Sequence, residues 1–183
     1  MKHRLFIAID FPDEVKQSVY QNVKKMIKGS DLRISKPENL HITIKFLGDV
    51  EETKILEIIS SLDFLKSIRG ETVNFSRYGF FYRNRVPAVF WLKCEVGENV
   101  ISTVKKLETV CEQIGFKKVD REFVPHLTLC RIKREPDPAI VQKILNEPAI
   151  NLATTISNIT LFSSVLTEKG AIYTVLHNYQ ELK

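Results

Sequence analysis

Apolar side chains recur along the chain with two periods, and these periods predict the order of the elements. Residues 5–11 are apolar on both faces of an extended chain, which is typical of a strand inside a sheet. Pro12 and two acidic residues then open a segment with apolar residues at helical spacing as far as Ile27, which predicts a helix. Residues 51–65 have the same spacing and predict a second helix.

The next part of the chain repeats this order. Residues 72–82 and 86–96 are rich in β-branched and aromatic side chains, and the short turn between them predicts a hairpin. A helix that begins near Glu98 and ends at Gly115 follows. The pattern also predicts short strands over 32–35 and 117–119, a helix over 139–145, a long strand over 153–165 and a last strand over 171–179.

One short stretch occurs twice. Residues 40–48 are LHITIKFLG and residues 125–131 are PHLTLCR, and both have the composition of a strand. In each copy a histidine is followed two residues later by a threonine, as His41 and Thr43 and as His126 and Thr128. Side chains at i and i+2 of a strand share a face. Each copy therefore places an imidazole and a hydroxyl side by side.

The spacing between elements indicates an internal duplication. Asp13, near the start of the first helix, precedes His41 by 28 residues, and Glu98 precedes His126 by the same number. Two strand–helix–strand–helix–strand units related by a pseudo-twofold axis would bring both histidine strands to one cleft. No linker separates the halves, so we expect residues 1–183 to form one bilobal domain, with the motifs at 41–44 and 126–129.

The histidines admit several interpretations. A single His-x-Thr stretch is more often an ordinary half-buried strand, but its duplication at equivalent positions argues against this for His41 and His126. For His3, at the start of the chain, and His177, in the last predicted strand, we expect no such role. A metal held by His41, His126 and Cys130 is an alternative, because Cys130 has the parity of His126. Neither motif offers a carboxylate to orient a ligand. Cys130 as a nucleophile is a weaker alternative, since it lies among apolar neighbours.

Paired acid–base catalysis fits the residue types better. Imidazole titrates near pH 6.5, so one histidine can accept a proton while the other donates one, as cleavage of a phosphodiester requires. The threonine hydroxyls and a cation would then bind the phosphate oxygens. Lys45 shares the parity of His41. Arg131 is at odd spacing from His126, so it reaches the cleft only if the strand twists, bulges or ends there.

At these residues the chain resembles the two-histidine phosphoesterases, and within them the RNA 2′,3′-cyclic phosphodiesterases, which are also called 2′-5′ RNA ligases. The resemblance rests on both His-x-Thr motifs, on residues 4–10, on Phe46-Leu47-Gly48, on Arg131 and on residues 164–173. It implies an α+β, bilobal fold with two pseudo-symmetric antiparallel or mixed sheets, helices on the outside and a central cleft. It also implies hydrolysis of a terminal 2′,3′-cyclic phosphate to a 2′-phosphate, without metal or cofactor.

The same resemblance assigns roles to residues. It implies His41 as the proton donor, His126 as the proton acceptor and Arg131 as a substrate contact. We expect Thr43 and Thr128 to bind the phosphate as well, with Lys45 and Phe46 as further substrate contacts. The expected partners are RNA ends or nucleotides bearing a 2′,3′-cyclic phosphate, with no obligate protein partner. Weak 2′-5′ ligation would be the reverse reaction. The rival interpretations are an RNA-end binding module without turnover and an esterase for other cyclic phosphates or 2′-5′ oligonucleotides.

Composition bears on the class of partner and on the cellular compartment. The 183 residues include 27 Lys and Arg against 22 Asp and Glu, a net charge of +5, which permits an anionic partner without requiring one. The basic residues are dispersed, which disfavours purely electrostatic binding of nucleic acid. Three cysteines without close pair spacing suit a reducing compartment. No apolar stretch approaches the roughly 20 residues of a membrane span. We therefore expect a cytoplasmic protein that does not engage membranes.

Overall fold

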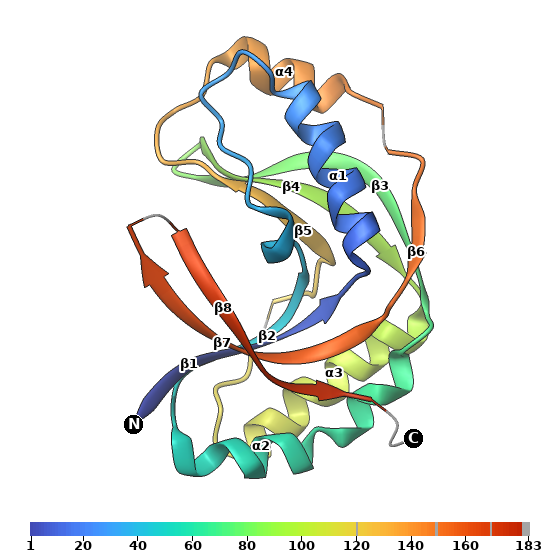
Figure 1. Cartoon of the computed structure of the whole chain (residues 1–183), viewed down its shortest axis with the longest axis vertical. Coiled ribbons are helices and arrows are strands. Elements are labelled where there is room, and N and C mark those ends of the chain that lie inside the picture. The colour runs from blue at the N-terminus through green and yellow to red at the C-terminus, as the bar shows by residue number, and fades with distance from the viewer. Residues whose placement is uncertain (120, 149, 169, 181–183) are drawn as a thin grey trace.

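Eight strands and four helices make up the computed structural model, which describes residues 1–119, 121–148, 150–168 and 170–180 (Figure 1). The strands are β1 (Lys2–Asp10), β2 (Ile42–Glu51), β3 (Thr72–Arg83), β4 (Val86–Val96), β5 (His126–Arg131), β6 (Ala153–Thr155), β7 (Asn158–Thr167) and β8 (Gly170–Tyr179). The helices are α1 (Asp13–Met26), α2 (Ile55–Ser61), α3 (Glu98–Gln113) and α4 (Pro138–Asn146).

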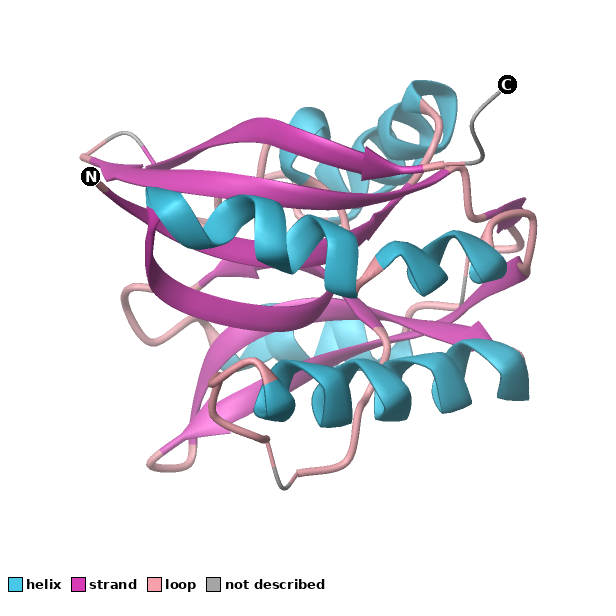
Figure 2. Ribbon diagram, turned by 90° about the horizontal axis from the view of Figure 1, so that it is seen from below, coloured by secondary structure: helices cyan, strands magenta, loops and turns pink. Residues whose placement is uncertain are grey.

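The strands form one curled sheet in the order β6-β3-β4-β5-β2-β1-β7-β8, and every neighbouring pair is antiparallel. Figure 2 shows how strongly the strands bend. β5 and β2, the two histidine strands, meet at the centre through one pair, Ile42 with Leu127. The sheet thus consists of two four-stranded halves joined at a single position. The predicted α+β class is confirmed, whereas the two predicted sheets are the two antiparallel halves of one continuous sheet.

Each half contains one strand–helix–strand unit, and its helix lies against the opposite half. α1 follows β1 but lies beside β3 and β4 (Figure 1). α3 follows β4 but contacts β2 of the other half. Both helices bury one apolar stripe, and Val19 and Val23 of α1 are completely buried, as is Leu107 of α3. This exchange ties the two halves into one hydrophobic core.

Four predicted elements differ from those in the structure. The predicted long strand 153–165 is broken at residues 156–157, because β6 pairs with β3 at one edge of the sheet whereas β7 pairs with β1 in the other half. Ile156 is buried at the crossing, and its N–H donates to the Glu71 carbonyl at 2.9 Å. Segments 32–35 and 117–119 are not strands. The predicted helix 51–65 consists of α2 between the 3₁₀ turns Glu52–Lys54 and Asp63–Ile68.

Within the part of the chain that the structure describes, no helix is long and apolar enough to span a bilayer. Lys169, which belongs to the C-terminal stretch 164–173 used in the resemblance, lies outside the described residues.

Candidate active site

The register between β2 and β5 brings the two His-Thr pairs together. Ile42 and Leu127 lie opposite each other and are 0% and 1% exposed, so their side chains face the core. Because side chains alternate along a strand, the residues on either side of this pair face away from the core. The motif residues there are all partly exposed: His41, Thr43, His126 and Thr128. The structure therefore places two imidazoles and two hydroxyls on one face, around the centre of the sheet.

His41 lies in an aromatic environment. Its ring centroid is 5.0 Å from that of Phe6 and 5.3 Å from that of Tyr173, which meets it edge-on. Its Nε2 lies 3.1 Å from the hydroxyl oxygen of Thr43. Burial, followed by the nearby charge of Lys16, lowers the pKa of His41 to about 4. The free protein therefore carries His41 as a neutral imidazole at pH 7.

His126 is fixed by its own backbone. Its Nδ1 lies 2.7 Å from the Val124 carbonyl oxygen, which can only accept, so Nδ1 carries the proton in the neutral ring. Nε2 is then left with its lone pair. Phe81 packs edge-on against the ring at 4.9 Å between centroids. Burial lowers the pKa of His126, with Arg131 and Arg121 acting in the same direction. The second imidazole is therefore also neutral at pH 7, with Nε2 able to accept a proton.

A register shift follows the threonine in each motif. Along β2 the pairing with β1 passes from Thr43 to Lys45, leaving Ile44 as an extra residue. Along β5 the pairing with β4 passes from Thr128 to Cys130, leaving Leu129 as an extra residue. An extra residue changes the face of everything after it. Two consecutive side chains in each strand are consequently buried, and the next one is exposed.

The shift overturns the predicted position of Lys45. Its side chain is fully buried on the core side, where Nζ pairs with Glu108 of α3 and donates to the Lys117 carbonyl at 2.8 Å. Phe46 takes the exposed position instead, 57% exposed, with its ring 6.0 Å from Phe6 on the histidine side. The prediction that Lys45 faces the cleft is wrong, because a two-residue period holds only while the ladder is regular.

The equivalent shift in β5 brings Arg131 to the histidines. Arg131 is exposed, and its charge adds to the effect of burial in lowering the pKa values of His41 and His126. The pKa of Tyr173 is raised by burial, and the charge of Arg131 opposes that shift. The bulge that the parity argument required is therefore present. Cys130 is buried on the core side at 2% exposure, which removes it from any metal site with the histidines. Among the described residues, no group of three His, Cys, Asp or Glu side chains is arranged to hold a metal.

Sequence reasoning missed two neighbours of His41. Lys16 of α1 is 7% exposed and pairs with Asp10 at the end of β1, with 2.7 Å between Nζ and Oδ1. Tyr173 of β8 reaches His41 from the distant hairpin, which is tied to the motif by a 3.2 Å hydrogen bond from the Asn39 amide to the Ala171 carbonyl. The sequence signal for Lys16 was its position on the otherwise apolar stripe of α1. Tyr173 was noted only as the last residue of the stretch 164–173 in the resemblance, and nothing local assigned it to the site.

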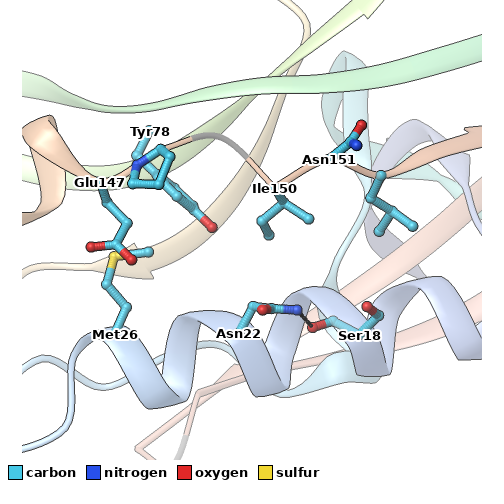
Figure 3. Close-up of a pocket in the computed structure, with 9 residues that line it drawn as sticks. Ser18, Asn22, Met26, Tyr78, Glu147, Ile150 and Asn151 are labelled. Carbon is cyan, nitrogen blue, oxygen red and sulfur yellow. Dashed lines mark hydrogen bonds between the residues drawn. The ribbon is translucent and has the colours of Figure 1, made fainter.

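A separate cavity of about 420 Å³ lies between α1 and the segment that follows α4 (Figure 3). Ser18 and Asn22 of α1 face Tyr78, Glu147 and Asn151 across it. Burial, followed by the charge of Glu147, raises the pKa of Tyr78, so its hydroxyl stays protonated. None of the motif residues lines this cavity, and we assign it no chemistry.

A duplicated α+β fold with two facing His-Thr pairs defines the class of two-histidine phosphoesterases. The chain belongs to the family described as LigT like Phosphoesterase, whose model matches it twice, over residues 9–91 and 92–173.

Relatives with curated names cover almost the whole chain. An RNA 2′,3′-cyclic phosphodiesterase of Thermotoga maritima is 35% identical, over 97% of this chain and 95% of the relative. One of Methanocaldococcus jannaschii is 32% identical, over 96% and 99%. Among solved structures, a Thermus thermophilus protein superposes with a TM-score of 0.81 at 24% identity, covering 96% of both chains, and shows the fold alone. Escherichia coli LigT complexed with 3′-AMP gives a TM-score of 0.77 at 25% identity, covering 97% of both chains.

Proposed function

We propose that the protein hydrolyses the 2′,3′-cyclic phosphate at the 3′ end of RNA and leaves a 2′-phosphate. The observation that carries this proposal is the pair of His-Thr motifs brought together at the Ile42–Leu127 pair. Relatives from bacteria and archaea that match nearly the whole chain are named RNA 2′,3′-cyclic phosphodiesterase. RNA ends or nucleotides in the cytoplasm are the proposed substrates, in keeping with the 3′-AMP and ATP held by Escherichia coli LigT.

In the proposed reaction, a water molecule gives a proton to Nε2 of His126 and attacks the cyclic phosphorus. The bond from phosphorus to the 3′ oxygen breaks, and His41 supplies the proton that this oxygen takes up. The state of His126 supports its role, because Val124 fixes the proton on Nδ1. The Thr43 and Thr128 hydroxyls and the Arg131 guanidinium are proposed to bind the phosphate oxygens, where negative charge develops.

The lowered pKa values fit this scheme once the substrate is present. Burial, and after it the charges of Lys16 and Arg131, disfavours a charged His41 in the free protein. A cyclic phosphodiester carries a negative charge, and an opposite charge within about 4–6 Å favours the protonated imidazole. Binding of the substrate would therefore raise the pKa of His41 and give the site its proton donor. Tyr173, on the same face, is proposed to contact the ribose or base of the reacting nucleotide, and Phe46 is proposed to contact the substrate beyond it.

A product assay tests the proposal. An RNA oligonucleotide ending in a 2′,3′-cyclic phosphate is incubated with the protein in excess EDTA, and phosphorus NMR identifies which hydroxyl keeps the phosphate. We expect turnover to a 2′-phosphate at the same rate with and without EDTA, since the proposed groups need no metal. A 3′-phosphate product or absence of turnover would overturn the assignment. Loss of activity on chelation, with recovery on adding a divalent cation, would overturn the metal-independent mechanism.

A further inference from the structure

A basic groove opens beside the histidine cleft. Its cavity has a volume of about 500 Å³ and is lined by Phe46, Lys117, Lys118, Val119 and Arg121. Three of these side chains are cationic, and Phe46 presents a large, exposed aromatic ring. None of the described residues that line the groove is acidic. Cations combined with an exposed aromatic ring are the means by which proteins bind single-stranded nucleic acid, through phosphates and stacked bases.

The groove adjoins both histidines. The Phe46 ring lies 6.0 Å from that of Phe6, and the Phe6 ring lies 5.0 Å from that of His41. At the other end, Arg121 is close enough to His126 to lower its pKa. A strand whose terminal phosphate lies between the histidines can therefore continue directly into the groove.

Residues 117–119, which form the basic side of the groove, are held in place by hydrogen bonds between their backbone and the side chains of Lys45 and Glu108. Lys45 donates to the Lys117 carbonyl at 2.8 Å, and Glu108 accepts from the Val119 backbone N–H at 3.0 Å. Lys45 and Glu108 also pair with each other across β2 and α3. The backbone of residues 117–119 is thus fixed by two bonds to one ion pair, of which Lys45 is fully buried and Glu108 is 16% exposed, while its own side chains stay exposed.

The Lys45–Glu108 ion pair is better explained by its bonds to the backbone of residues 117–119 than by a contribution to the stability of the fold. Removing two charges from water is unfavourable, and a buried pair often stabilises a fold no more than apolar residues of similar volume. The equivalent position in the other half is Cys130, which fills the core without a partner charge. The register shift at Ile44 has two effects at once, because it turns Lys45 inward to hold the loop and Phe46 outward to face it.

We propose that this groove binds the RNA strand immediately 5′ of the reacting nucleotide. Phe46 stacks on a base, and Lys117 and Arg121 contact backbone phosphates. The preferred substrates are then single-stranded 3′ ends rather than mononucleotides. Lys118 contributes less, since it faces Glu112 in an exposed pair at 3.6 Å. This inference rests on the proposed function for the identity of the terminal group.

The test compares two substrates in each variant. One is a nucleoside 2′,3′-cyclic phosphate and the other is a six-nucleotide RNA with the same cyclic end. We expect the parent to favour the RNA in kcat/KM, and Phe46→Ala to reduce that preference about tenfold, mainly through KM, since stacking on one aromatic ring is lost. The double variant Lys117→Gln/Arg121→Gln should reduce it as well. The matched control is Lys24→Gln/Lys25→Gln, which removes two exposed charges from α1 and should leave the preference unchanged.

Equilibrium binding separates this inference from the proposed function. A fluorescent six-nucleotide RNA with a stable 3′-phosphate is titrated by anisotropy at several salt concentrations. Each phosphate contact on a single strand contributes about 0.7 to the slope of log K against log salt. For the Lys117→Gln/Arg121→Gln variant, which loses two contacts, the slope of log K against log salt should therefore be shallower than that of the parent by about 1.4. Equal slopes in parent, variant and control would overturn the proposal that the groove binds RNA. So would a parent that shows no preference for RNA over the mononucleotide. A parent that binds RNA with the expected slope but turns over neither substrate would overturn the proposed function alone.

Discussion

The two halves of the sheet contain the same register shift but position different side chains with it. In each histidine strand an extra residue, Ile44 or Leu129, turns one side chain inward and the next outward. In the first half these are Lys45 and Phe46, and in the second half Cys130 and Arg131. The inferred duplication thus supplies a symmetric frame, while single positions within it make the two sides unequal. A symmetric cleft could not distinguish the two ends of a bound phosphodiester.

The walls of the cleft differ between the halves as well. Opposite Thr43 stands Ala8, and His41 is enclosed by rings from β1 and from the β7–β8 hairpin. Opposite Thr128 stands Trp91, whose ring reaches His126. His41 has a pKa lowered to about 4, with burial as the main cause in both histidines. Unequal surroundings of two identical groups are how proteins assign one as acid and the other as base.

The largest effect on activity should follow removal of either histidine, which tests whether the two halves supply different proton-transfer groups. Proton transfer by a side chain contributes typically about 10²–10⁴-fold, so we expect His41→Gln and His126→Gln each to lose at least that factor in kcat. Each should also flatten one limb of the pH–rate profile. Circular dichroism and thermal unfolding establish that the variants are folded. Near-normal turnover in either folded variant would contradict the paired acid–base mechanism.

The threonines and Arg131 should come next. A hydrogen bond to a charged group contributes about 1.5–3 kcal/mol, so Thr43→Val and Thr128→Val should each lower kcat/KM about 10–150-fold. Valine keeps the shape and strand preference of threonine while it removes the hydroxyl. Because these groups hold the phosphate rather than move protons, both limbs of the pH profile should stay in place, as they should in Arg131→Ala. Parent-like kcat/KM in both threonine variants would mean that the hydroxyls are ordinary strand residues.

Alternation along each strand predicted which motif residues share a face, and the inferred duplication predicted that the two strands meet. Alternation placed each threonine on the face of its histidine, and the observed Ile42–Leu127 pair agrees with the predicted facing of the two strands. The same rule failed for Lys45, because one extra residue reverses the face and leaves no mark in an apolar strand. It left Arg131 conditional on such a bulge for the same reason. A two-residue period therefore locates a site only as far as the first irregularity.

Other failures came from contacts between distant parts of the chain. Residues 117–119 were predicted to form a strand, but their backbone bonds to the side chains of Lys45 and Glu108 and not to a neighbouring strand. Residues 153–165 have strand composition throughout, and nothing local shows that β6 and β7 pair with different halves. Tyr173 reaches His41 only because the β7–β8 hairpin folds over the motif. Such partners are set by tertiary packing, which overrides local preference.

A smaller effect, on stability, should follow substitution of Gly79, which packs against Trp91 in the half of the sheet that carries His126. Gly79 lies opposite Trp91, and a Cβ built at Gly79 would come within 2.5 Å of the indole ring. Gly79→Ala should therefore push Trp91 toward His126 and destabilise the fold by about 1–3 kcal/mol, as overpacking does. Urea unfolding measures the loss. Adding Trp91→Phe, which shortens the ring, should restore part of it, and strictly additive effects would contradict a direct clash.

The smallest expected effect is a difference between two pH optima. Acid–base catalysis by the pair requires one protonated and one neutral imidazole, and this form is most abundant between the two pKa values. Both pKa values are lowered below 6.5 in the free protein, and that of His41 to about 4, so kcat/KM should be greatest below pH 6.5. A bound phosphate raises both pKa values, so the optimum of kcat should lie about one pH unit or more higher. The comparison requires both profiles on one substrate, at constant ionic strength. Coincident optima, or a kcat/KM optimum above pH 7, would show that burial and Arg131 do not control the histidines as the structure indicates.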